Sequence, residues 1–172
     1  MERRAVDRVG RGRRELDGGS RAVLYSENVL TTDHKGAIAE SAIVHAATKL
    51  GIDVYKPLAG GGRYDLIFDV RDKLLRVQCK WATLSEEVVV VRCYSCRRGA
   101  ERMIVRAYTS EEVDAIVAYC AELDRCYFLP PARFAGRWQV HLRTAPCRNN
   151  QRVGVHMASD YLLEARLHAS GP

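Results

Sequence analysis

The stretch that decides the fold reads Arg63-Tyr64-Asp65-Leu66-Ile67-Phe68-Asp69-Val70, then Arg71-Asp72-Lys73, then Leu74-Leu75-Arg76-Val77-Gln78-Cys79-Lys80-Trp81. Both arms have the composition of strands and the middle segment reads as a turn, so we predict a β-hairpin. Because side chains alternate between the two faces of a strand, Asp65, Gln78 and Lys80 are expected on one face. The opposite face is expected to be apolar and consists of Leu66, Phe68, Val70, Val77, Cys79 and Trp81.

The polar face of this hairpin carries a carboxylate, an amide oxygen and an ammonium group. Asp65 and Gln78 offer the oxygen ligands that a hard divalent cation prefers. Lys80 offers a charge that can orient a nucleophile or neutralise a phosphate. The alternative is a hairpin face that carries ordinary solvated charge, and the rest of the chain has to decide between the two.

Length and composition indicate one globular domain. The 172 residues are 47% hydrophobic, which allows a sizeable core. No apolar run is long enough for a membrane span, and the Arg-rich N-terminus lacks the apolar block of a signal peptide. We therefore expect a cytoplasmic protein without membrane contact, whose net charge of +6 permits a polyanionic partner.

Arginines gather in two segments of the sequence. Residues 126–159 contain no acidic residue and five arginines, and a second group between Arg92 and Arg106 is interrupted only by Glu101. Such clusters are often solvated faces, but beside a candidate metal site they favour contacts with DNA phosphates. The residues to which we assign DNA contacts are Arg97, Arg98, Arg143, Arg148, Arg152 and, in the hairpin, Arg63.

Residues 1–30 are predicted to form a disordered basic arm, because arginines and glycines there leave no hydrophobic periodicity. The arm either steers the protein to nucleic acid or is an extension without function. Residues 31–172 then form a single domain.

A helix is predicted from about residue 34 to residue 50. Thr31, Thr32 and Asp33 supply N-cap residues and Gly51 ends the helix. The side chains expected to face the core are Ala37, Ile43, Val44, Ala47 and Leu50.

The remaining elements are four further strands and two helices. Strands are predicted at 52–56, 86–94, 126–129 and 138–142, and a terminal helix at 161–168. The four valines at 88–91 are typical of the centre of a sheet. The sequence Thr109-Ser110-Glu111-Glu112 is a capping box, which predicts a helix to about Cys120 with Asp114 on its surface.

Six cysteines raise the question of a structural zinc ion. Cys93 and Cys96 have the spacing of a ligand pair, but no second pair accompanies them. We therefore expect buried free thiols in a reducing compartment.

In the hairpin at residues 63–81, the sequence resembles the PD-(D/E)xK nuclease superfamily. Within that superfamily it resembles most the branch of group I intron-associated homing endonucleases. Tyr64-Asp65 stands for Pro-Asp and Gln78-Cys79-Lys80 for Glu-x-Lys, and the intron-associated branch resembles this chain in its glutamine. Glu40 matches a glutamate that points from the preceding helix into the metal site of that family. The resemblance runs from about Asp33 to about Tyr161.

The resemblance implies an α/β fold (α+β, with a mixed sheet) of the restriction-endonuclease type. Its core has the order αβββαβ, with a central mixed sheet flanked by helices. The implied function is a metal-dependent endonuclease that hydrolyses phosphodiester bonds in double-stranded DNA. Mg²⁺ is the implied cofactor, for which Mn²⁺ can substitute, and a homodimer or homotetramer is expected because each site cuts one strand.

The resemblance also implies roles for individual residues. The catalytic residues are Glu40, Asp65, Gln78 and Lys80, where Lys80 positions or deprotonates water or stabilises charge on the phosphate. The metal ligands are Asp65, Gln78, the carbonyl of Cys79 and Glu40. Two alternatives stay open: a Holliday-junction resolvase or repair nuclease of the same superfamily, and a DNA-binding module whose active site has decayed.

Overall fold

The computed structural model describes residues 30–146 and 154–168. The predicted basic arm lies outside this range except for its last residue, as do Arg148, Arg152 and Cys147. No helix in the described part of the chain is both long enough and apolar enough to cross a membrane.

Helix α1 (Thr32–Lys49) opens the described fold. The Thr31 side chain accepts a hydrogen bond from the backbone N–H of His34, which confirms the predicted N-cap. Gly51, at a φ of 73°, follows the last turn, a conformation that glycine adopts without strain. The predicted core stripe is wrong at Ala37, which is exposed, because Ala39 is the residue that turns inward with Ile43 and Ala47.

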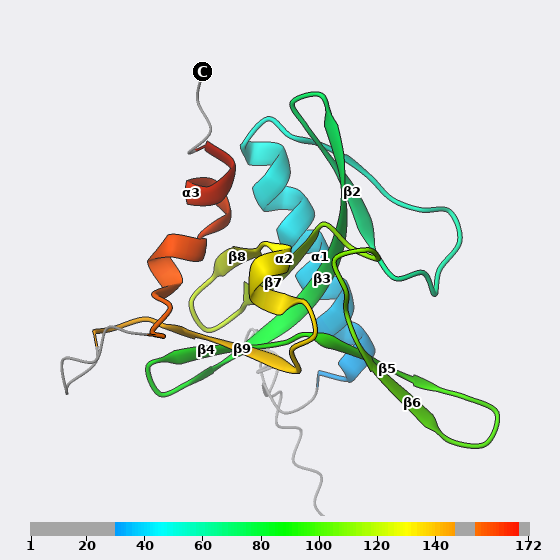
Figure 1. Cartoon of the computed structure of the whole chain (residues 1–172). Helices are drawn as coiled ribbons and strands as arrows, with labels where there is room; N and C mark the ends of the chain where they lie inside the picture. Colours follow the sequence, from blue (N-terminus) through cyan, green and yellow to red (C-terminus); the bar gives the residue numbers. More distant parts are fainter. Residues whose placement is uncertain (1–29, 147–153, 169–172) are drawn as a thin grey trace, which may run out of the picture.

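Within the described residues, seven strands form the main sheet, which contains both parallel and antiparallel pairs. The predicted mixed sheet with flanking helices is thereby confirmed (Figure 1). The strands are β1 (Asp53–Tyr55), β2 (Leu66–Val70), β3 (Lys73–Ser85), β4 (Val88–Arg92), β7 (Ala115–Cys120), β8 (Arg125–Leu129) and β9 (Gln139–Arg143).

Strand β3 is the centre of this sheet because its 13 residues pair with three different neighbours. Its first part pairs with β2 antiparallel, residues 77–82 pair with β7 parallel, and its last part pairs with β4 antiparallel. Strands β8 and β9 extend the sheet from β7 and β4. The Gln78-Cys79-Lys80 segment therefore lies in the most constrained strand of the fold.

The β2–β3 hairpin has the two faces that the alternation predicted. Leu66 pairs with Val77 and Phe68 with Leu75 in the register, and Leu66, Phe68 and Val77 are buried. Gln78 and Lys80 fall at the alternate positions of β3 and therefore face the other side. The prediction of an apolar face and a polar face on this hairpin is confirmed.

Hydrophobic residues cover both faces of the sheet. On one face, Ile43 and Ala47 of α1 pack against Leu66, Phe68 and Val77. The other face packs against two short helices, α2 (Pro131–Phe134) and the 3₁₀ helix η2 (Ala158–Tyr161). The predicted terminal helix appears as η2 followed by α3 (Leu163–His168).

The predicted helix from Thr109 to Cys120 is wrong. Thr109 and Glu112 do form the capping-box contact, since the N–H of Thr109 donates to Glu112 Oε2 at 3.3 Å, but the chain continues as strand β7. Strand β7 lies between β3 and β8, and five of its six residues are buried. A strand buried on both faces has no alternating pattern, so it reads like a capped helix in the sequence. The chain between β3 and β7 runs through strands and not through a helix.

The junction into β7 is held by an ion pair between Asp114 and Arg76. Arg76 donates to both carboxylate oxygens, from Nε at 2.9 Å and Nη2 at 3.0 Å, and its backbone N–H donates at 2.8 Å. These hydrogen bonds lower the pKa of Asp114. The pair therefore fixes the start of β7 beside β3.

We expect Asp114→Asn to lower the free energy of unfolding near neutral pH by about 1–2 kcal/mol, a value reduced by solvent screening of the pair. The pKa of Asp114 is depressed in the folded state, so its contribution is present above the ordinary value of 3.8 and is lost as pH falls through the folded pKa. Urea unfolding at about pH 7 and about pH 3 measures this. Asp72→Asn in the exposed turn is the control, and an equal effect of both variants would refute the assignment.

Strand β4 lies between β3 and β9, which confirms the predicted position inside the sheet, but the strand is shorter than predicted and its burial differs. Its burial alternates, with Val89 and Val91 buried and Val88 and Val90 partly exposed, and it ends at Arg92. After Cys93 the chain enters a separate two-stranded sheet made of β5 (Tyr94–Arg98) and β6 (Met103–Ala107). Although all four residues at 88–91 are valines, only one face of β4 is fully buried.

The cysteines of the described chain are free thiols. Those at positions 79, 93, 120 and 126 are buried as predicted, whereas Cys96 on β5 is exposed. Burial raises the pKa of Cys93 to about 11 and that of Cys126 to about 12, so these two buried thiols stay protonated at neutral pH.

Candidate active site

Asp65 stands directly before β2, at the edge of the polar face. Its backbone N–H donates to the carbonyl of Val77 at 2.9 Å, which continues the β2–β3 pairing. Its Oδ2 accepts a hydrogen bond from the N–H of Cys79 at 2.9 Å. Burial raises the pKa of Asp65, and the charge of Glu40 adds to this effect. A partly buried carboxylate is thus fixed against the strand that carries Gln78 and Lys80.

Gln78 is polar but buried, with 7% of its surface exposed. Its Nε2 donates to Asp65 Oδ2 and also to the carbonyl oxygen of Cys79, the latter at 3.1 Å. Two oxygen atoms predicted as metal ligands therefore converge on one atom of Gln78. This convergence brings Asp65, Gln78 and Cys79 together as predicted.

These donors fit a hard divalent cation. A carboxylate, a backbone carbonyl and a side-chain amide are oxygen ligands of the kind that Mg²⁺ and Ca²⁺ take. A half-turn of the Gln78 amide replaces its nitrogen by its oxygen, so all three residues can offer oxygen. No group of three or more His, Cys, Asp or Glu side chains that could hold a metal ion occurs within residues 30–146 and 154–168.

Lys80 is held on the same face, one pleat further along β3. Its Nζ donates to the carbonyl of Tyr94 and to the hydroxyl of Tyr108, each at 3.1 Å, and lies 4.8 Å from the centre of the Tyr108 ring. Burial lowers the pKa of Lys80, opposed by the charge of Asp65. The ammonium has three N–H donors, so two contacts leave one for a phosphate or a water molecule.

Glu40 lies on α1 and pairs with a lysine that follows β1. Its carboxylate accepts from Lys56 Nζ at 2.7 Å. The charge of the same carboxylate adds to the rise in the pKa of Asp65. Lys56, which the sequence analysis does not single out, pairs with Glu40, and a role of Glu40 as a metal ligand stays a prediction.

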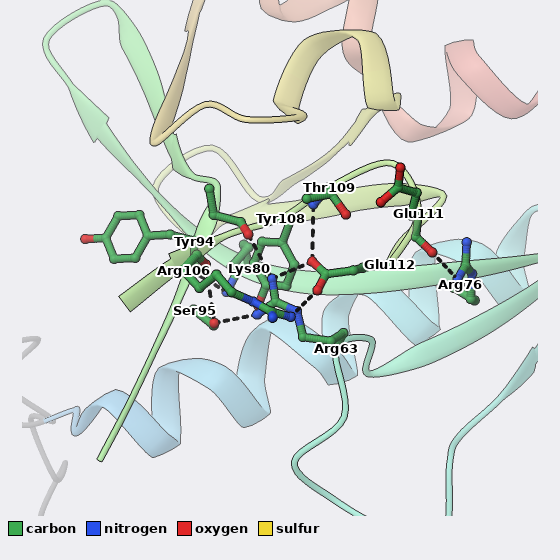
Figure 2. Close-up of polar contacts among 11 residues, drawn as sticks. Arg63, Arg76, Lys80, Tyr94, Ser95, Arg106, Tyr108, Thr109, Glu111 and Glu112 are labelled. Atoms are coloured by element: carbon green, nitrogen blue, oxygen red, sulfur yellow. Dashed lines mark hydrogen bonds and ion pairs between the residues drawn. The ribbon is translucent and has the colours of Figure 1, made fainter. Parts of the chain in front are cut away.

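Arg63 connects the loop before β2 to the β5–β6 sheet (Figure 2). Its guanidinium donates to Ser95 Oγ at 2.6 Å, to the carbonyl of Ala107 at 2.9 Å and to Glu112 at 2.8 Å. It also stacks 4.2 Å from the centre of the Tyr108 ring. Arg63 was predicted to contact DNA, and that remains a prediction, but four of its interactions lie within the protein.

Glu112 also pairs with a second cation, because the guanidinium of Arg106 on β6 contacts its Oε1. The hydrogen bond from Arg63 lowers the pKa of Glu112. The ring of Tyr108 contacts both Arg63 and Lys80. A carboxylate and an aromatic ring therefore hold Arg63, Arg106 and Lys80 in one network.

The other arginines assigned to DNA have different surroundings. Arg97 and Arg98 are exposed on β5. Arg143 on β9 pairs with Glu87 at 3.1 Å and donates from Nε to the carbonyl of Ala145 at 3.0 Å. Contacts of these arginines with DNA remain predictions.

Three residues that contact the predicted site residues are not identified by the sequence analysis. They are Tyr108, Lys56 and Glu112 as the partner of two arginines. In the sequence, Tyr108 lies between an arginine-rich segment and the capping box, and Glu112 belongs to that box. All three contact partners at least 14 residues away in the sequence, which local patterns do not reveal.

Comparisons with known proteins identify a similar family and a similar solved structure. The model of a family described as PD-(D/E)XK endonuclease matches residues 30–164. A solved structure described as a bacterial homing endonuclease, I-Ssp6803I, is similar with a TM-score of 0.64 and 30% sequence identity. The similarity covers 82% of this chain and 97% of that chain. A comparison with curated proteins found no match.

Proposed function

The chain belongs to the PD-(D/E)XK endonuclease family, and on that premise we propose that it is a Mg²⁺-dependent endonuclease that hydrolyses phosphodiester bonds in double-stranded DNA. The convergence of Asp65 Oδ2 and the Cys79 carbonyl on Gln78 is the observation that carries this proposal. It supports a site that collects oxygen ligands beside a lysine, as hydrolysis of a phosphodiester requires.

We assign the metal ligands to Asp65, Gln78, the Cys79 carbonyl and, directly or through water, Glu40. Nucleases of this family generally use divalent metal ions. Mg²⁺ suits a site with one or two carboxylates because it keeps several of its waters, and Mn²⁺ is expected to substitute. When bound, the ion supplies Lewis-acid activation of water and stabilises charge on the phosphate.

Lys80 acts on the phosphate or the attacking water from a fixed position. The Tyr94 carbonyl and the Tyr108 hydroxyl hold its ammonium, so little reorientation is needed when DNA arrives. Water attacks phosphorus, the P–O bond to the leaving group breaks, and the remaining N–H of Lys80 donates to the group that gains negative charge. The proton of the water leaves to solvent or to a nearby base.

The test is nicking of supercoiled plasmid by the purified chain with Mg²⁺ and with EDTA. Strand cleavage that requires the metal supports the proposal, and binding without cleavage supports the decayed DNA-binding module instead. Comparison of a linear duplex with a four-way junction separates an endonuclease for duplex DNA from a junction resolvase. We also propose that the chain acts as a homodimer or homotetramer, because each site cuts one strand, and its molar mass in solution tests this.

Gln78→Glu tests the ligand set without relying on activity. The substitution replaces an N–H donor by a carboxylate that faces Asp65 and the Cys79 carbonyl, so we expect about 1–3 kcal/mol lower stability in EDTA. Mg²⁺ should restore the lost stability, and it should raise the melting temperature of the variant more than that of the wild type.

Thermal unfolding with and without Mg²⁺ measures both effects. Gln139→Glu on β9 is the matched control, because Gln139 is exposed and lies outside the candidate site. If Mg²⁺ shifts Gln78→Glu no more than the control, Gln78 is not a metal ligand.

A further inference from the structure

The β5–β6 hairpin projects from the body of the protein as a sheet of its own (Figure 1). Its five pairs run from Tyr94–Ala107 at the base to Arg98–Met103 near the tip. At about 3.3 Å per residue, each strand extends about 17 Å. The N–H of Gly99 donates to the Arg102 carbonyl at 2.8 Å, and a Cβ on Gly99 would lie 2.8 Å from the same oxygen. The tip is therefore a tight turn that requires glycine.

Three successive apolar side chains on β6 are exposed. Met103 is 56% exposed, Ile104 40% and Val105 44%. In a strand that pairs on one edge only, such a run is unfavourable in water unless another molecule covers it. Arg97 lies opposite Ile104 and Arg98 opposite Met103, so each face of the hairpin combines apolar and cationic side chains.

The charge of this hairpin indicates what covers it. Residues 94–107 carry one acidic residue, Glu101, and four arginines, Arg97, Arg98, Arg102 and Arg106. Packing the hairpin against that of a second copy would bring arginines together, which is unfavourable. The major groove of DNA, about 12 Å wide, admits a two-stranded β-ribbon between two rows of phosphates. There, arginine donates to guanine O6 and N7, and apolar side chains contact the thymine methyl group.

We propose that the β5–β6 hairpin enters the major groove of the DNA duplex and reads base edges there with Arg97, Arg98 and the apolar segment Met103–Val105. The inference rests on the proposed function for the substrate, double-stranded DNA, and adds the element and the groove through which it is recognised.

The base of the hairpin lies at the candidate active site. The carbonyl of Tyr94, the first residue of β5, accepts the hydrogen bond from Lys80 at 3.1 Å. Ser95, the second, accepts the hydrogen bond from Arg63 at 2.6 Å. The segment that positions Lys80 is therefore the segment from which the hairpin extends, so the bases that are read lie within one hairpin length of the phosphate that is cut.

The experiment selects duplexes from a random double-stranded library with the full chain in EDTA, where no cleavage competes. The selected duplex is then prepared with 7-deazaguanine, which lacks N7, with deoxyuridine, which lacks the thymine methyl, or with inosine, which lacks the minor-groove amino group. We expect the two major-groove changes to weaken binding by about tenfold or more and inosine to leave it nearly unchanged. Inosine effects larger than those of the major-groove analogues would overturn the proposal.

Variants connect this readout to the hairpin. Arg97→Ala and Arg98→Ala should lower the ratio of selected to scrambled duplex affinity by about tenfold, whereas Arg125→Ala, an exposed arginine on β8, should retain it. An unchanged ratio in both hairpin variants, or a selection that enriches no sequence, would overturn the proposal. A selected duplex that is bound through the hairpin but is not cut with Mg²⁺ would refute the proposed function and leave this inference intact.

Discussion

Replacing Asp65 or Lys80 by alanine is expected to lower Mg²⁺-dependent nicking by at least about a hundredfold. In the proposed site Asp65 is the charged oxygen ligand, and Lys80 is the ammonium that Tyr94 and Tyr108 hold. Both side chains stand on the polar face of the hairpin and fill no part of the core. The chain should therefore keep its fold in both variants.

The two variants should differ in how they bind DNA when no metal is present. Loss of Asp65 removes a negative charge beside the phosphate and tightens binding, whereas loss of Lys80 removes a positive charge and weakens it. Asp65→Asn serves as a second variant, because its side-chain oxygen can still accept the N–H of Cys79. Circular dichroism confirms folding, and cleavage that persists in all three variants would place the active site elsewhere.

Replacing Arg63 by alanine is expected to lower the free energy of unfolding by about 2–4 kcal/mol. The substitution removes the hydrogen bonds to Ser95, Ala107 and Glu112, and it leaves the face of Tyr108 uncovered. These contacts connect the loop before β2 to the base of the β5–β6 hairpin. Hydrogen exchange of the β5 and β6 amides should therefore speed up by an order of magnitude or more, even without DNA.

Arg106→Ala is the matched control for Arg63. Both arginines pair with Glu112, but the Arg106 side chain is 58% exposed and that of Arg63 22%. An exposed ion pair contributes about 0–1 kcal/mol, so the control should change stability little. If both variants lose the same stability, or if Arg63→Ala leaves exchange in the hairpin unchanged, Arg63 does not fasten the hairpin and its role is better sought in contact with DNA.

The β2–β3 hairpin and its polar face follow from the sequence alone. The period-two alternation from Asp65 to Val70 and from Leu75 to Lys80 fixes which side chains share a face, and a shift by one residue would expose Leu66 and Phe68. Helix α1 is equally predictable because Thr31 caps it and Gly51 ends it, and both signals are local. The family resemblance rested on these segments, and the comparisons confirm it.

Strand β7 shows what local sequence cannot decide. Thr109 and Glu112 form the predicted capping contact, and the following residues suit a helix or a doubly buried strand. Pairing with β3 and β8 makes residues 115–120 a strand, because only the completed sheet satisfies their backbone groups in a buried position. The separation of β5–β6 from β4 at Cys93 is likewise decided by pairing between distant residues.

The sequence by itself determined that Asp65, Gln78 and Lys80 lie on one face, since strand periodicity is a local property. The tertiary structure alone decided how they are held: Lys80 by Tyr94 and Tyr108, Glu40 by Lys56, and Arg63 by Glu112. Each of these contacts joins residues 14 to 49 positions apart in the sequence, which meet only when the whole chain folds. Burial then lowers the pKa of Lys80 and raises that of Asp65, a property of the packed surroundings that no spacing in the sequence encodes.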